Sequence, residues 1–431
     1  MKTAVLLLSA LLVVCSAGAR TFVHPGIDVS QADIDRARAF VAEGREPWAS
    51  SFAALKASPY SSLEAPVFDR GISLVGANCN GTIGMDGRRA HDLALLYRLT
   101  DDVRYAEKAT AFLNANSHYE TLDSRGTAPL DNGKIYLLVE AAELLRYYPG
   151  WAKADKVRFA KMLRDVFYPM IKDGDPARFG NQGLFAYRGA LAIAIFLEDE
   201  CKYDRIWRYL NGLPHRADQE AYVSGPARVG PLLNEDAFQR TWAILGQADE
   251  IADYGYDEQL RYYIYANGQC QESSRDQGHV MAGLFQMVAI AEAFWLQGDD
   301  LYGALDNRIL KGLEWNLRFN FGAWEPRGFT DDEREATFDN GLFYRARHRS
   351  GRWQSLAPHM DKPEFGGPGA PREAAYAHYL HDAKLPPDQL AWLKKAIDQE
   401  NAKNGGFETW GKAPNWQYEW SGWGTLMKRR L

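Results

Sequence analysis

A dense group of polar side chains precedes an apolar stretch in the second half of the chain: Glu272, Arg275, Asp276, Gln277 and His279. The apolar residues that follow, from Met281 to Ala293, recur with a period near 3.6 and predict a buried helix. Arg275 and His279 are four positions apart, so a helix would place them on one face. An arginine beside a histidine suits an anionic ligand. The same residues would also fit a charged helix start capped by a serine, and spacing alone leaves both interpretations open.

The wider segment has a recognisable pattern. "GQCQESSRDQGH", followed by "DLYGALDNRILKGLEW", resembles the signature of the alginate-lyase-like secreted polysaccharide lyases, which include enzymes that cut mannuronan and glucuronan. The similarity extends upstream through "FGNQGLFAYRGALAIAIFLED" and "EPWASSFAALKASPY" to "FVHPGI", so it covers most of residues 22–320, and the downstream third matches much more weakly. The resemblance implies an α/α toroid and a lyase that needs neither a metal nor a cofactor.

The chemistry expected of such an enzyme is β-elimination on a uronic-acid polymer. A base removes the proton next to the carboxylate, and the glycosidic oxygen on the neighbouring carbon leaves. The enzyme must neutralise the carboxylate so that it can take up the developing enolate charge. It must also place a base near the proton and an acid near the leaving oxygen. Asn, Arg and His suit the first task, and Tyr or His suits the second.

Three residues are predicted to handle the carboxylate. The resemblance assigns carboxylate neutralisation to Asn181, where related lyases carry Gly-Asn-aromatic; Gln182 replaces the aromatic here. Asn181 would equally serve as a helix N-cap. His279 is predicted to stabilise the carboxylate or act as the base, and Arg275 to bind the carboxylate through both guanidinium nitrogens. Arg275 could instead pair with Glu272 or Asp276.

The catalytic tyrosine is predicted to be Tyr344. A tyrosine has an ordinary pKa near 10 and needs a nearby cation to act as a base, and Arg345, Arg347 and His348 follow Tyr344 closely. Tyr187, Tyr265 and Tyr302 are the alternatives, although Tyr302 is expected to be structural. Further candidates for contact with the anionic chain are Arg88, Arg89, His91, Gln182, Tyr187, Glu272, Arg345 and Arg347.

Helix follows helix, with short links, from about residue 30 to residue 320. No run of alternating strands and no short internal repeat interrupts this order. The pattern predicts an all-α protein built from antiparallel hairpins, and an α/α toroid, an incomplete barrel whose inner helix ends line a cleft, fits this size. Residues 59–87 are expected to be a long loop. Residues 20–431 are expected to form one domain, with 321–431 supplying cleft-covering loops and closing helices.

Residues 1–19 have the pattern of a secretory signal: Lys2, an apolar run, and a small-residue cleavage site at Ala17-Gly18-Ala19. We therefore expect a secreted protein, and we expect no later stretch long and apolar enough to span a membrane. Cys15 leaves with the signal. The remaining Cys79, Cys201 and Cys270 allow at most one bridge and one free thiol.

The composition narrows the possible partners. The net charge of −6 argues against general nucleic-acid binding but permits a local basic cleft for a polyanion. We therefore expect a monomer that acts on an anionic polysaccharide. Two alternatives remain: a glycoside hydrolase on uronide-containing glycans, for which Asp86, Glu272 and Asp276 could supply opposed carboxylates, and a non-catalytic carbohydrate-binding protein. The hydrolase would make no new double bond, and the binding protein would cause no turnover.

Overall fold

The computed structural model of the protein describes residues 20–74, 78–122, 128–175, 180–222, 258–270, 272, 277–322, 370–408 and 422–431. Its helices are α1 (Gln31–Ala42), α2 (Trp48–Ala57), α3 (Asn78–Thr100), α4 (Val103–Ala115), α5 (Ala128–Gly133), α6 (Tyr136–Leu144), α7 (Lys153–Met162), α8 (Tyr168–Ile171), α9 (Asn181–Phe196), α10 (Glu200–Leu210), α12 (Leu260–Tyr263), α13 (Gln277–Leu296), α14 (Ala304–Gly322), α16 (Arg372–Ala377), α17 (Ala391–Lys403) and α18 (Gly424–Met427). Two very short strands, β1 (Ser73–Leu74) and β2 (Thr121–Leu122), pair in parallel.

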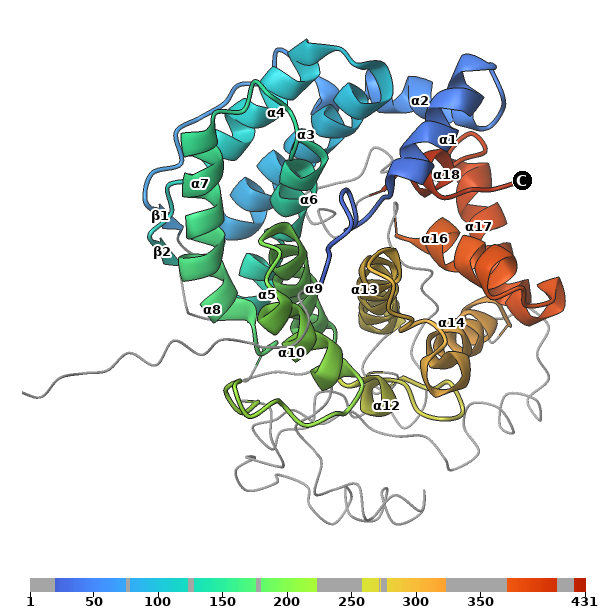
Figure 1. Cartoon of the computed structure of the whole chain (residues 1–431). Coiled ribbons are helices and arrows are strands. Elements are labelled where there is room, and N and C mark those ends of the chain that lie inside the picture. The colour runs from blue at the N-terminus through green and yellow to red at the C-terminus, as the bar shows by residue number, and fades with distance from the viewer. Residues whose placement is uncertain are drawn as a thin grey trace, which may run out of the picture.

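The helices form a ring in two layers, as the view along the ring axis shows (Figure 1). Helices α9, α13 and α16 lie on the inside, and α7, α10, α14 and α17 lie on the outside. Every residue of α9 except Gln182 is buried, because this helix is covered on all sides, and its sequence is correspondingly apolar all round. The outer helix α10 instead buries one face and leaves the other partly buried. This architecture confirms the all-α toroid.

Local sequence signals set several helix boundaries. Ser30 caps α1 in a capping box with Asp33, as its spacing predicts. The short link between α3 and α4 falls at Asp101, which adopts a left-handed conformation, and at Asp102, which caps α4. The expected loop over residues 59–87 is wrong at its end, because α3 already begins at Asn78. Gly87, which the sequence places in the expected loop, lies inside α3. A Cβ there would lie 2.7 Å from Leu137 Cβ, so the glycine lets α3 approach α6.

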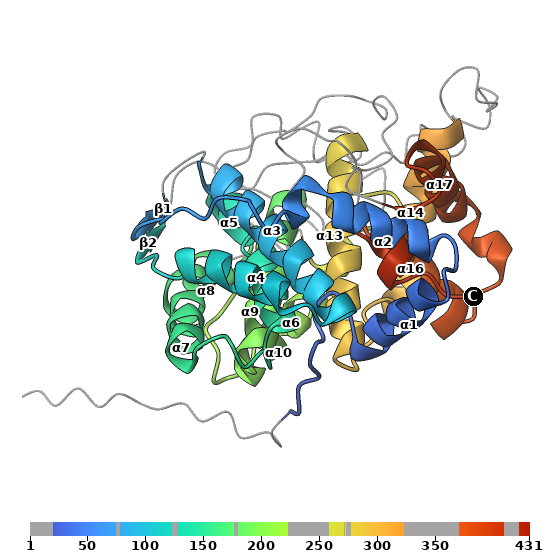
Figure 2. The ribbon, with the colours of Figure 1, turned by 90° about the horizontal axis from the view of Figure 1, so that it is seen from above.

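The inner helices cross the thickness of the ring. Helix α13 is seen end-on in Figure 1 and lengthwise in Figure 2. Beyond its C-terminal end, Gln297 holds the N-terminal segment: its side chain accepts from Val23 N at 2.9 Å and donates to Gly26 O at 2.7 Å. The N-terminal segment therefore covers the face of the ring where α13 ends, and the N-terminal ends of α9 and α13 belong to the opposite face.

The described C-terminal residues join the two ends of the chain. Lys428 donates to Asp33 of α1 at 3.0 Å and to Glu292 of α13 at 2.6 Å. The indole nitrogen of Trp423 donates to Asp92 of α3 at 2.9 Å. These contacts tie residues 422–431 to α1, α3 and α13, so the C-terminal segment bridges the first helices and the later helices of the ring.

Two further expectations can be compared with the structure. Helix α13 is long and apolar enough to cross a membrane, so the expectation that no later stretch has this length and composition is wrong. However, 72% of its apolar window is buried within the protein, as in the core helix of a globular fold. Cys201 is disulfide-bonded, and Cys270 is a buried free thiol.

Candidate functional site

The N-terminal ends of α9 and α13 meet at a small buried polar cluster, the Asn181 cluster, which consists of Asn181, Tyr263 and Glu272. The backbone N–H of Asn181 donates to Glu272 Oε2 at 2.7 Å. Its side-chain Nδ2 lies 2.8 Å from Oε1 and 3.1 Å from Oε2 of the same carboxylate. Tyr263 donates to Oε2 at 3.4 Å, and all three residues are buried. Glu272 thus caps α9 from a distant part of the chain.

Two glycines make room for this cluster. Gly180, which directly precedes α9, has a φ of 73°, and a Cβ there would lie 2.3 Å from Glu272 Oε2. Gly283 on α13 faces the cluster: a Cβ there would lie 1.6 Å from the Tyr263 hydroxyl and 3.2 Å from Asn181 Cβ. Larger residues at either position would push the carboxylate, the tyrosine or the asparagine out of place.

His279 lies one helical turn before Gly283 on α13. Residues four apart share a helix face, so His279 is on the side of α13 that faces Asn181. It is only partly buried, in contrast to the fully buried Tyr263 and Glu272. The structure therefore brings together Asn181, Glu272 and the face that carries His279. Arg275, Asp276, Tyr344, Arg345 and Arg347 lie outside the described residues.

Three of the predicted substrate-binding residues lie on α3 and have partners within the protein. Arg88 is fully buried and donates to Asp92 at 3.1 Å. Arg89 lies 3.7 Å from Asp86. His91 Nε2 is 2.8 Å from Asp28 of the N-terminal segment. Burial alone would lower the pKa of His91, but Asp28 and Asp92 outweigh it and raise the pKa to about 9.

The alternative tyrosines are also engaged in packing. Tyr187 is buried and stacks on Tyr209 of the outer helix α10, with ring centroids 4.7 Å apart. Tyr302 donates to Glu292 at 3.0 Å, and burial raises its pKa well above the usual value. Tyr265 is buried, and Gln182 is partly buried at the start of α9. Tyr263 was missed by sequence reasoning, because nothing in "LRYYIYANG" distinguishes it from its neighbours.

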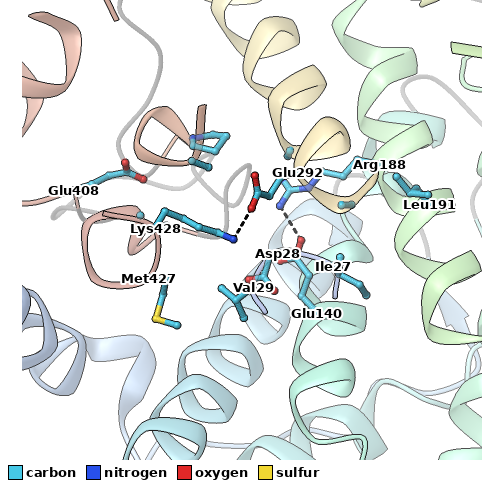
Figure 3. A pocket seen from close by; sticks show the side chains of 16 residues that line it. Ile27, Asp28, Val29, Glu140, Arg188, Leu191, Glu292, Glu408, Met427 and Lys428 are labelled. Atoms are coloured by element: carbon cyan, nitrogen blue, oxygen red, sulfur yellow. Dashed lines mark hydrogen bonds and ion pairs between the residues drawn. The ribbon is translucent and has the colours of Figure 1, made fainter. Parts of the chain in front are cut away.

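A cavity that opens to solvent lies farther along the inner helices (Figure 3). It begins about 10 Å along α9 from Asn181, at Arg188. Its ionisable lining consists of four carboxyl groups and two cations: Asp28, Glu140, Glu292, Glu408, Arg188 and Lys428. Figure 3 shows Lys428 directed at Glu292 and Arg188 directed at Glu140. Both cations are thus paired with carboxylates of the protein, which makes this cavity a poor place for a polyanion.

Three side chains beside the cavity have the spacing of metal ligands. Ligand atoms of Asp28, His91 and Glu140 lie within 4.8 Å of one another. His91 is already bonded to Asp28, and Glu140 accepts from Arg188 at 2.8 Å. The charges are therefore balanced by protein groups, and we interpret this cluster as an ion-pair network that holds the N-terminal segment against the ring.

Comparisons with known proteins give the fold. No family model matches the sequence, and no curated protein matches it. Among solved structures, alginate lyase A1-III from Sphingomonas species A1 aligns with a TM-score of 0.52 and 14% identity, over 94% of this chain and 98% of that one. A tyrosine-to-phenylalanine variant of that enzyme, complexed with a tetrasaccharide, aligns with a TM-score of 0.53 and 15% identity, over 93% and 94% of the two chains. The protein therefore has an alginate-lyase-like fold.

Proposed function

We propose that the protein is a secreted polysaccharide lyase that cleaves a β-1,4-linked polyuronate, glucuronan or mannuronate-rich alginate, by β-elimination. The observation that carries this proposal is the Asn181 cluster, which fixes an amide at the converging N-terminal ends of two inner helices, beside the face of His279. Helix N-termini carry partial positive charge and favour anions. The fold shared with alginate lyase A1-III adds support.

Asn181 can donate to a substrate while it remains bound to Glu272. The two N–H bonds of a planar amide diverge by about 120°, whereas the two Glu272 oxygens belong to one carboxylate and lie on one side of Nδ2. One N–H bond therefore serves Glu272, and the other points away from it. In the proposed mechanism this second N–H donates to the uronate carboxylate, and the bond strengthens as enolate charge develops.

The remaining roles are proposals for His279 and for residues outside the described part of the chain. His279 takes the proton next to the carboxylate or helps to neutralise the carboxylate, and Arg275 binds the carboxylate. Tyr344 donates a proton to the leaving glycosidic oxygen, with Arg345 and Arg347 holding the polyanion. The pair of electrons from the broken C–H bond forms the new double bond as the C–O bond breaks. The proposed enzyme uses no metal or cofactor and acts as a monomer.

The hydrolase alternative requires carboxylates that can reach a glycosidic bond. Asp86 is fully buried and accepts from Arg70 at 2.8 and 2.9 Å and from Asn116 at 3.0 Å. Glu272 is fully buried within the Asn181 cluster. These two of the three candidate carboxylates are thus occupied by protein donors, which favours the lyase; the third, Asp276, lies outside the described residues.

The test is ultraviolet absorbance over time with purified protein and separate solutions of glucuronan, polymannuronate and polyguluronate. The proposal expects a rise with glucuronan or polymannuronate, because β-elimination creates a conjugated double bond. New reducing ends without a rise would support the hydrolase. Intact polymer bound without either signal would support the carbohydrate-binding protein.

A further inference from the structure

Glu272 has an unusual place for a residue expected to touch substrate. Its side chain is fully buried, and both of its oxygens face protein donors: the backbone and side chain of Asn181 and the hydroxyl of Tyr263. It is also far from Asn181 in the chain, 91 positions away, so the contact joins two separate segments of the ring. These contacts point to an action through Asn181.

The chemistry of a carboxylate decides which end of the asparagine amide it meets. An ionised carboxylate only accepts hydrogen bonds, so it selects the NH₂ end of Asn181 and rejects the carbonyl end. Without Glu272, the amide could rotate by about 180° and present its oxygen in the other direction. A uronate carboxylate would be bound by the N–H and repelled by the oxygen. Glu272 therefore controls whether Asn181 attracts or repels such a substrate.

The packing around Glu272 and Asn181 restricts the orientations that their side chains can adopt. The close approach at Gly180 confines the Glu272 carboxylate, and the close approach at Gly283 confines Tyr263 and Asn181. The backbone N–H of Asn181 anchors the same Oε2 that Tyr263 contacts. The carboxylate is thus held at several points, and Asn181 is the member of the cluster whose side chain carries a second N–H.

We propose that Glu272 is a positioning residue, which locks the Asn181 amide with one N–H directed at the substrate carboxylate. The inference rests on the proposed function for its catalytic consequence. Tyr263 supports the same lock from the side of α12. The lock pre-organises the donor, so that no reorientation is needed as charge develops on the substrate.

The decisive variant is Glu272→Gln, which keeps the size of the side chain but can offer Asn181 either an oxygen or an NH₂ group. We expect kcat on the best polyuronate to fall about tenfold to a hundredfold, as for a misplaced catalytic group, with KM changed much less. In an Asn181→Ala background, Glu272→Gln should lower kcat no further, because Glu272 acts through Asn181. Glu143→Gln is the matched control: Glu143 is also buried and hydrogen-bonded, to His24 at 2.6 Å. This control should keep the wild-type kcat.

A readout that needs no turnover separates this inference from the proposed function. The side-chain amide protons of Asn181, identified by their loss in Asn181→Ala, should exchange slowly in the wild type and much faster in Glu272→Gln. Slow exchange in a wild type that cleaves no polyuronate would uphold the lock and overturn the lyase. Unchanged kcat in Glu272→Gln, or an equal loss of kcat with and without Asn181, would overturn the lock while the lyase stands.

Discussion

Two buried polar regions of the ring use the same kinds of residue in different ways. Around the cavity, arginine, lysine and histidine side chains face carboxylates and bind the chain ends to the ring, as Lys428 does with Asp33 and Glu292. In the Asn181 cluster, one carboxylate holds one amide, and the partly buried His279 lies one turn before Gly283, the glycine of α13 that faces the cluster. The first region balances its charges internally, whereas in the proposed mechanism the second donates a hydrogen bond to the substrate.

This difference separates structural from functional polar residues better than residue type does. Arg88 and His91 look like ligands for a polyanion in the sequence, but in the structure they pair with Asp92 and Asp28. Asn181 is a less conspicuous residue, yet it stands where two helix N-termini converge. The comparison predicts that changes in the ion-pair network lower stability and spare turnover, and that changes beside Asn181 lower turnover more than stability.

Replacing His279 is expected to have the largest effect on turnover. His279→Ala should lower kcat by about 10²–10⁴, the usual contribution of a positioned acid or base. The melting temperature should change little, because His279 is only partly buried. Turnover on polyuronate and thermal unfolding measure the two quantities. The exposed His118 supplies the control, and His118→Ala should leave both unchanged. Near-wild-type turnover of His279→Ala would remove His279 from the site.

Breaking the ion-pair network should lower the stability of the protein and leave its turnover unchanged. Lys428→Met leaves the carboxylates of Asp33 and Glu292 buried without their shared cation, which should cost about 3–5 kcal/mol of unfolding free energy. The kcat of the folded protein should be unchanged. Denaturant unfolding measures the loss, and Lys394→Met, which removes an exposed pair with Asp398, should cost less than about 0.5 kcal/mol. Equal losses from the two variants would contradict a structural role for the network.

Asn181→Ala should lower both the kcat and the stability of the protein. Removing a donor to the developing enolate should lower kcat by about 10²–10³. The variant also leaves Glu272 with fewer donors, which should cost about 1–3 kcal/mol of stability without unfolding the protein. Assays at a temperature where the variant is folded separate the two effects. A stability loss with full turnover would make Asn181 a helix cap only.

The pH dependence of stability gives the smallest effect. Burial, followed by the neighbouring Glu373, raises the pKa of Glu408 to about 8, so its carboxyl stays protonated in the folded protein at neutral pH. In the unfolded chain it loses its proton above its ordinary pKa near 4.3. The folded state therefore binds more protons between these values, and stability falls as the pH rises through that range. The stabilisation is complete below the lower value and lost above the upper one.

Replacing the carboxyl should remove this dependence. Urea unfolding of the wild type should show a loss on the order of 1–3 kcal/mol from Glu408 between about pH 5 and pH 8, and Glu408→Gln should flatten that part of the curve. His91 should still contribute a decline as the pH rises through about 9, since its raised pKa has the same sign. A Glu408→Gln curve as steep as that of the wild type would contradict the assignment.

Local signals explain how much of the fold was predictable. The capping box at Ser30 and the break at Asp101 depend on residues close by in the chain, so the local sequence indicates both. The start of α3 was misplaced because its glycines look like a loop, whereas Gly87 serves close packing against α6. Contacts between distant segments carry no local signal. The pairing of Lys428 with Asp33 and that of Glu272 with Asn181 became visible only in the folded ring.

The central claim is that this ring catalyses β-elimination, and the most direct measurement is the mass of the cleavage products formed in ¹⁸O-labelled water. Elimination adds no water to the broken bond, so the account predicts unsaturated oligouronides that carry no ¹⁸O. One ¹⁸O atom per broken bond, carried by the fragment with the new reducing end, together with saturated products, would show hydrolysis and contradict β-elimination.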